Sequence, residues 1–117
     1  MVLSAHNTQN SGNDPTAHAE ISLLRKAGKK LKTADLSNHC LFSNAEPCSM
    51  CMSAAIKARV FRVYFGAPHE PFMDPDLSAL DVAKHARERI HVEGGILGAE
   101  CRAQISRGRD LLNRPDN

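Results

Sequence analysis

Two short segments of the chain, thirty residues apart, carry side chains that can bind a metal ion. The first contains His18 and Glu20, and the second contains Cys48 and Cys51. Thiolate sulfur and imidazole nitrogen are the ligands that zinc prefers in proteins. Two residues separate the cysteines, so on a first helical turn both sulfurs share a face and can hold one ion. The sequence therefore predicts a zinc site with His18, Cys48 and Cys51 as its ligands.

The number of ligands indicates which kind of zinc site this is. A structural zinc has four protein ligands, whereas a catalytic zinc has three and keeps one position open. The other two cysteines, Cys40 and Cys101, stand alone and do not form a second pair. Glu20 follows His18 by two residues, where its carboxylate can move a proton between a water on the metal and a substrate. We therefore expect an open, catalytic site with Glu20 as its acid–base group.

Each of the two segments also has a simpler interpretation. A single Cys-x-x-Cys pair occurs in redox sites and in halves of structural zinc ribbons, and a single His-x-Glu on a helix is commonly a solvated surface. A ribbon needs a second cysteine pair at similar spacing, which the sequence lacks. The His-x-Glu segment precedes the cysteine pair, and both segments lie at predicted helix starts. The catalytic interpretation is therefore the stronger one.

The elements that must position these residues alternate between strands and helices. Asp14 is expected to cap the first helix with Pro15 at its first position, and Pro47 is expected to open the second helix. Hydrophobic periodicity and turn-forming residues predict strands at 2–5, 39–43, 60–66 and 90–93, and helices at 15–30, 47–59, 77–89 and 97–112. This alternation predicts an α/β layered domain with the zinc ligands at one end of a central sheet.

Length and composition fit one domain spanning residues 1–117. No apolar run reaches the length of a membrane span, and no N-terminal signal is recognised. Four cysteines, two of them at metal spacing, indicate a reducing compartment. We therefore expect a cytoplasmic protein that does not contact a membrane. The net charge of +2 is too small to argue for nucleic-acid binding by itself.

The two motifs resemble those of a known enzyme family. His18–Glu20 followed by Pro47–Cys51 is similar to the signature of the zinc-dependent nucleobase and nucleoside deaminases, the cytidine and deoxycytidylate deaminase-like superfamily. The resemblance runs from about residue 3 to residue 107, and residues 93–101 look like the last strand and helix of the family. It implies a three-layer α/β/α fold with a mixed central sheet. The predicted helix at 77–89 suggests a crossover between parallel final strands, as in the guanine deaminase and tRNA-adenosine deaminase branch.

The resemblance also implies a reaction, the hydrolytic deamination of an amino-substituted ring with release of ammonia. One zinc ion per chain makes hydroxide available at neutral pH. Glu20 takes the proton of the water, delivers it to a ring nitrogen and assists the departure of ammonia. Backbone N–H groups near Cys48 stabilise the tetrahedral intermediate. Substrate contacts are implied for Asn7, Ala19, Phe72 and Asp74, although Asn7 is equally consistent with a turn and the last two with an ordinary loop.

Three functions remain open on this basis. Guanine is the favoured substrate, because residues 67–76 lack the Asp-x-Lys-x-Gly pattern of tRNA-adenosine deaminases and Phe72–Asp74 resembles the guanine branch. A tRNA-specific adenosine deaminase is the alternative. Its support is a set of arginines that could contact phosphates but also fit a solvated helix face, namely Arg102, Arg107, Arg109 and Arg114. The third possibility is an inactive or partner-dependent subunit. A small nucleobase or nucleoside is thus the expected partner, and the resemblance implies a homo-oligomer, a dimer.

The start of the chain departs from the pattern of the family. Family members usually begin with a helix and an apolar strand that precede the segment matching Val2–Ala5, and that strand lies inside the sheet. Its absence would leave backbone groups unpaired and the core thin. Three explanations are open: residues 2–6 take its place, a partner chain supplies a strand, or the reading frame is truncated.

Overall fold

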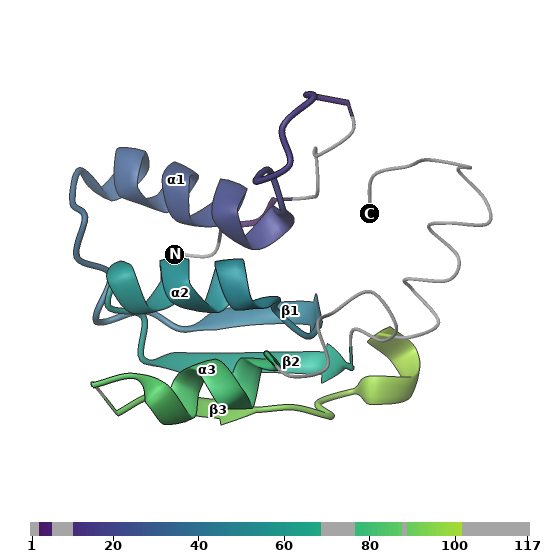
Figure 1. Ribbon diagram of the computed structural model, residues 1–117. Helices are drawn as coiled ribbons and strands as arrows, with labels where there is room; N and C mark the ends of the chain where they lie inside the picture. Colours follow the sequence, from purple (N-terminus) through teal and green to yellow (C-terminus); the bar gives the residue numbers. More distant parts are fainter. Residues whose placement is uncertain (1–2, 6–10, 69–76, 88, 102–117) are drawn as a thin grey trace.

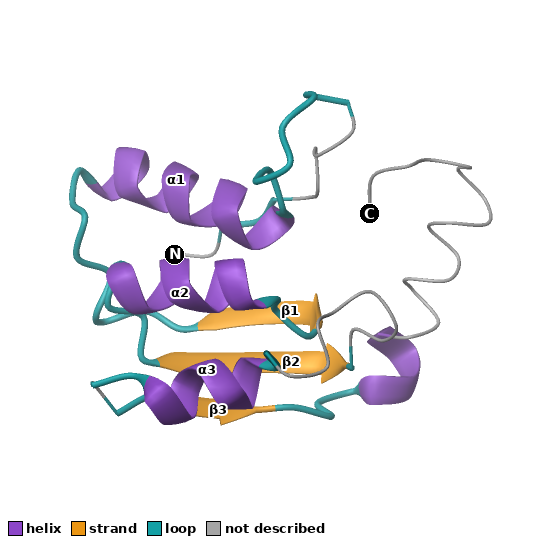
Figure 2. Ribbon diagram, in the orientation of Figure 1, coloured by secondary structure: helices purple, strands orange, loops and turns teal. Residues whose placement is uncertain are grey.

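The chain folds into a sheet of parallel strands covered by helices. The structure is a computed structural model that describes residues 3–5, 11–68, 77–87 and 89–101. Its elements are α1 (Ala19–Leu31), β1 (Leu41–Ala45), α2 (Ser49–Lys57), β2 (Arg62–Ala67), α3 (Ala79–His85) and β3 (His91–Glu93). Figures 1 and 2 show the strands side by side with the helices stacked against them. The expected α/β fold class is confirmed.

The sheet has the order β1-β2-β3, and both strand pairs are parallel, as expected for the final strands. Leu41, Val63 and Val92 align across the three strands and pack into the core around Met52. Because successive strand residues point to opposite faces, the next row, which contains Phe42 and Tyr64, lies on the other side. Phe42 is half exposed, whereas Val63 is fully buried. One face of the sheet is therefore core and the other is open.

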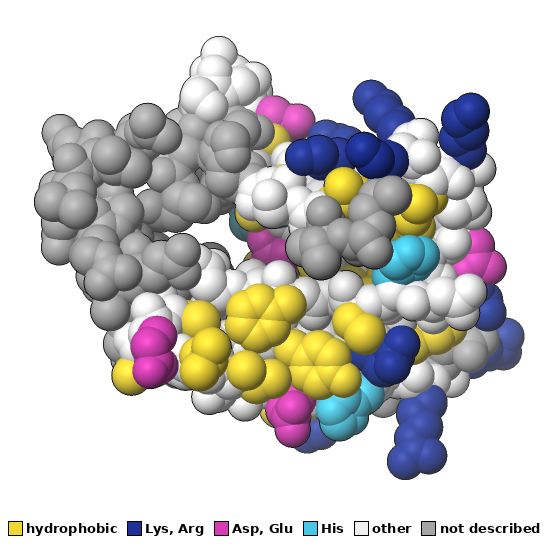
Figure 3. Space-filling model, turned by 180° about the vertical axis from the view of Figure 1, so that it is seen from behind, with side chains coloured by type: hydrophobic (Ala, Val, Ile, Leu, Met, Phe, Trp, Pro, Cys, Tyr) yellow, Lys and Arg dark blue, Asp and Glu magenta, His cyan; other side chains and the backbone are white. Residues whose placement is uncertain are grey.

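The expected third layer and the mixed sheet are not found in the described residues. Helices α2 and α3 contact each other, and α1 packs against α2. Each crossover moves one strand further in the same direction, so right-handed connections place α2 and α3 on the same face. Helices on both faces require a strand order that reverses direction, and the order β1-β2-β3 does not. Figure 3 shows hydrophobic side chains gathered on the face that these helices leave open.

The helix starts differ from the predictions in a consistent way. Asp14 does not cap α1; its carboxylate accepts hydrogen bonds from the N–H and hydroxyl of Thr16, at 2.9 and 2.7 Å, and forms a turn. The helix begins four residues after Pro15, with His18 as its N-cap. Pro47 likewise precedes α2, whose N-cap is Cys48. In both segments that carry the predicted ligands, the first ligand is therefore the N-cap residue at the start of a helix. The observed strands and α3 lie within or close to their predicted ranges, with shifts of a few residues at their ends.

The predicted strand at residues 2–5 is wrong for its described part, because Leu3 to Ala5 form no strand. Leu3 instead lines an apolar cavity of about 90 Å³ between α1 and the start of β1. The carbonyl of Ser4 accepts a hydrogen bond of 3.0 Å from the Lys26 ammonium. The segment therefore lies beside the sheet without extending it. Of the helix predicted at 97–112, residues 98–101 are helical and the rest lies outside the described residues.

No helix in the described part of the chain has the length and apolar character needed to cross a membrane.

Candidate metal centre

Two helix starts bring the predicted ligands together. His18 is the N-cap of α1 and has extended backbone angles, φ −66° and ψ 156°, and its side chain does not cap the helix. Cys48 is the N-cap of α2 with similar angles, and Cys51 lies within the first turn. The two helices pack side by side and begin at the same end of the sheet, where the strands end (Figure 1). The imidazole and both thiols consequently point toward one another.

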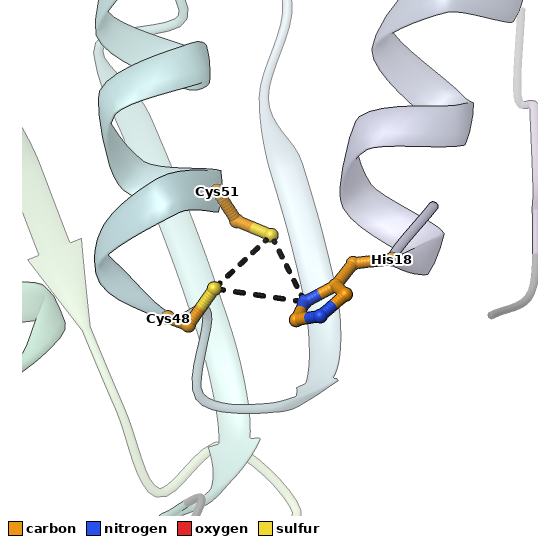
Figure 4. Close-up of side chains that lie close together, drawn as sticks. All are labelled: His18, Cys48 and Cys51. Atoms are coloured by element: carbon orange, nitrogen blue, oxygen red, sulfur yellow. Dashed lines mark hydrogen bonds between the residues drawn. The ribbon is translucent and has the colours of Figure 1, made fainter. Parts of the chain in front are cut away.

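The distances between the three donor atoms match those around a tetrahedral zinc ion. The Sγ atoms of Cys48 and Cys51 are 3.6 Å apart, and each lies 3.6 Å from Nδ1 of His18 (Figure 4). Zinc bonds of about 2.3 Å to sulfur and about 2.0–2.1 Å to nitrogen give tetrahedral edges of about 3.8 Å and about 3.6 Å. The chemistry of the donors and their spacing therefore both fit zinc.

The site has three ligands rather than four. Within the described ranges, no further histidine, cysteine or carboxylate joins the group formed by His18, Cys48 and Cys51. Cys51 is fully buried, whereas His18 and Cys48 are partly exposed. One side of the group thus faces the core and the other is accessible. Such an arrangement can leave a zinc coordination position for water or substrate, which is characteristic of catalytic sites.

Glu20 lies beside the ligands without being one of them. Its side chain is within hydrogen-bonding reach of the Cys51 thiol, and burial raises the pKa of its carboxyl above the usual range. Nearby Cys48 acts in the same direction, because a thiolate disfavours a second negative charge. A carboxyl group with a raised pKa accepts and returns protons more readily near neutral pH than an exposed one.

The pKa values of the two cysteines shift in opposite directions when no metal is bound. The hydrogen bond between the Cys48 and Cys51 thiols, whose Sγ atoms are 3.6 Å apart, lowers the pKa of Cys48 to about 5. The hydrogen bond to Cys48, followed by burial and the Glu20 carboxylate, raises the pKa of Cys51. The site therefore contains one ready thiolate and one thiol that must lose its proton when a metal binds.

The other predicted site residues have different outcomes. Ala19 is the first residue of α1 and is partly buried next to His18. Asn7, Phe72 and Asp74 lie outside the described residues, so their predicted substrate contacts stay predictions. Glu46 is a further residue next to the site that the motifs do not indicate; its carboxylate accepts a hydrogen bond from the backbone N–H of Ala79 in α3, 33 residues away. An acid two positions before a ligand is the only local signal for such a contact.

Comparison with known proteins identifies the family. The cytidine and deoxycytidylate deaminase zinc-binding region matches residues 1–67, more than half of the chain, and the chain belongs to this family of zinc-dependent deaminases. Zinc is therefore its cofactor, and the group of His18, Cys48 and Cys51 is a site that can hold it.

The relatives of the chain include a guanine deaminase, tRNA-specific adenosine deaminases and tRNA(Ile)-lysidine synthases. Guanine deaminase of Bacillus subtilis is 36% identical over 93 residues, which are 76% of this chain and 60% of that protein. The tRNA-specific adenosine deaminase of Buchnera aphidicola (Schizaphis graminum) is 35% identical over 107 residues, which are 91% of this chain and 70% of that protein. The chain thus spans between about three fifths and about seven tenths of these two relatives.

Solved structures of both kinds of deaminase also match the chain. A structure of a tRNA:A34 deaminase shares 31% identity and a TM-score of 0.72, over 83% of this chain and 71% of that one. A structure of guanine deaminase from Nitrosomonas europaea shares 27% identity and a TM-score of 0.69, over 87% and 62% of the two chains. The fold of the family is therefore shown, and both kinds of deaminase occur among its neighbours.

Proposed function

We propose that this protein is a zinc-dependent deaminase that hydrolyses the bond between a ring carbon and its amino group in a nucleobase or nucleoside. The observation that supports the proposal is the group of three donors, 3.6 Å apart, with the partly buried Glu20 beside it. A ribbon or redox cysteine pair explains neither the imidazole nor the adjacent acid. Residues 1–117 form the single catalytic domain in this proposal.

The residues of the chain divide the chemistry among them. His18, Cys48 and Cys51 hold zinc, which supplies Lewis-acid activation of water. A carboxylate oxygen of Glu20 would accept one proton from the attacking water and pass it to a ring nitrogen. It would then take the second proton, from the new hydroxyl on the tetrahedral ring carbon, and pass it to the leaving amine. One water is consumed, the amino group leaves as ammonia, and the ring carbon gains the oxygen.

Guanine is the substrate that we favour. The relative from Bacillus subtilis and the structure from Nitrosomonas europaea are guanine deaminases, and Phe72–Asp74 resembles that branch in sequence. Asn7, Ala19, Phe72 and Asp74 are the proposed substrate contacts. Adenosine in tRNA is the second candidate, because the tRNA-specific adenosine deaminase of Buchnera aphidicola (Schizaphis graminum) matches the chain at similar identity and over more of its length. A homo-oligomer is proposed on the resemblance alone.

Ammonia release from guanine, from cytosine and from an adenosine-containing tRNA stem-loop separates the candidates. The protein is first assayed for zinc, with one ion per chain expected, and the Glu20→Ala variant serves as the control. That variant should keep its zinc and release no ammonia, since Glu20 is not a ligand. Turnover of the stem-loop alone would replace guanine by tRNA as the substrate.

A zinc-loaded protein that releases ammonia from none of the three would contradict the proposal of an enzyme acting alone. The partner-dependent subunit would then be the better explanation, and addition of a longer relative would restore turnover.

A further inference from the structure

Glu46 connects the metal segment to two points that are distant in sequence. It lies between the end of β1 and Pro47, two residues before Cys48. Its backbone N–H donates a hydrogen bond of 2.8 Å to the carbonyl of Ala67. Its carboxylate Oε2 accepts a hydrogen bond of 3.0 Å from the backbone N–H of Ala79. Ala67 is the last residue of β2 and Ala79 the first of α3, so one residue ties both elements to the metal segment.

The contact with Ala79 is not needed to start α3. Ser78 caps that helix by itself: its hydroxyl accepts from the N–H of Asp81 at 3.2 Å, and the Asp81 carboxylate accepts from the N–H and hydroxyl of Ser78. This reciprocal arrangement satisfies two of the N–H groups that every helix start leaves unpaired. The N–H of Ala79 is a third, and Glu46 alone accepts it among the described contacts. The start of α3 is therefore formed without Glu46, and the Glu46 carboxylate attaches it to the segment that contains Cys48.

Burial makes this attachment firm. Ala79 is fully buried and Ala67 nearly so, and Pro47 between Glu46 and Cys48 is also buried. Water has little access to replace a hydrogen bond lost at Ala79, and an unpaired buried N–H is costly. Proline has a fixed φ angle, so the backbone at Pro47 can adjust little. A displacement of the Glu46 backbone therefore also displaces the backbone of Cys48. Cys48 is in turn the N-cap of α2, and its carbonyl accepts from the N–H of Met52 at 2.9 Å.

We infer that Glu46 is a positioning residue for the zinc site, which holds Cys48 in place by binding the ends of β2 and α3. Its carboxylate is not among the donor atoms of the metal group, and it acts through the backbone of Ala79. This inference rests on the proposed zinc ligands but not on any substrate.

Zinc affinity tests the inference directly. Competition with a chelator gives the apparent dissociation constant for Glu46→Ala, Glu46→Gln and the control Ser78→Ala, alongside the melting temperature of each zinc-free protein. Glu46→Ala should weaken zinc binding about tenfold or more, the size typical of residues that orient ligands. Glu46→Gln should restore most of the affinity, since an amide oxygen can accept from Ala79. Ser78→Ala should lower the melting temperature and leave zinc affinity unchanged.

Two results would overturn the inference. The first is a Glu46→Ala protein with the zinc affinity of the wild type. The second is a loss of affinity in Ser78→Ala equal to that in Glu46→Ala, because stability of α3 would then explain both. If Glu46→Ala does not fold, Ala79→Pro removes the same hydrogen bond at a helix position that tolerates proline, and it should weaken zinc by a similar factor. A wild type that binds no zinc would refute the proposed function instead.

Discussion

Cys51 is the most deeply buried of the three proposed ligands. Its substitution is therefore the most informative test of the metal assignment. The Cys51→Ala variant should lose zinc, since two ligands remain and the cavity left behind is closed to water. Elemental analysis should give close to one zinc per chain for the wild type and close to none for the variant. The exposed Cys40 provides the matched control, because Cys40→Ala removes a thiol outside the site. Equal zinc in both variants would refute the ligand set.

Glu20 should make the zinc-free protein less stable at neutral pH than at acid pH. Burial raises its pKa in the folded state above the usual 4.5. Its contribution to stability is therefore fully present below about pH 4.5 and is lost as the pH rises through the folded pKa. Glutamine stays neutral at every pH, so Glu20→Gln should melt at a higher temperature than the wild type near pH 7.

The pH dependence of that difference is the decisive measurement. Melting curves of both zinc-free proteins between pH 4 and pH 8 should show the advantage of Glu20→Gln growing with pH and vanishing at the acid end. A constant difference would mean that the amide alters packing and that the carboxyl does not carry the effect.

At the scale of single residues, the sequence predicts the metal group well because its chemistry is local. His18, Cys48 and Cys51 are recognised by side-chain type and by their positions at helix starts, and the structure brings them together. Glu46 could not be found in this way. Its partner Ala79 is a backbone group 33 residues away, and no side-chain pattern marks a backbone donor.

Among the elements, β2 depends on a close approach that leaves no room for a side chain at Gly94. A Cβ added there would overlap the ring of Phe65, a core residue of β2. Gly94→Ala should therefore cost about 1–3 kcal/mol of unfolding free energy, the usual range for overpacking. Urea unfolding gives the value. At Gly98 an added Cβ meets only a carbonyl at 3.5 Å, so Gly98→Ala should unfold close to the wild type. Equal losses would contradict the role of Phe65.

Helices and strands are predictable where the local sequence favours one structure. They are less predictable where the same residues favour two structures equally. The branched and aromatic residues Val63, Tyr64 and Phe65 of β2 favour a strand. The start of α1 was misplaced, because Asp14 and Pro15 are equally suited to open a helix or to form a turn. The hydrogen bonds of Asp14 to Thr16 favour the turn. The number of layers depends on the order of the strands in the sheet. The strand propensities of single residues do not predict that order.

For the whole molecule, zinc should act as a stabilising ligand. Held by His18, Cys48 and Cys51, it would join α1 to α2 in the folded state. A ligand that binds only the folded state raises stability by about 4 kcal/mol at a thousand times its dissociation constant. The melting temperature should therefore rise with free zinc and fall on addition of a chelator. Magnesium at equal concentration is the control, since it prefers oxygen ligands. An equal rise with magnesium would mean that the effect does not come from this site.

The position of α1 also has a consequence for the order in which the protein opens. This helix packs mainly on α2, with the apolar cavity of about 90 Å³ on its inner side, whereas β2 is paired on both edges. Zinc bound by His18, Cys48 and Cys51 would add a second attachment for α1, besides the packing of its apolar side chains on the core. Amide hydrogens of α1 should exchange with solvent deuterium much faster once zinc is removed, while those of β2 change little. Partial opening of one helix would thus precede global unfolding, and the time that α1 stays attached would be set by how tightly the site holds its ion.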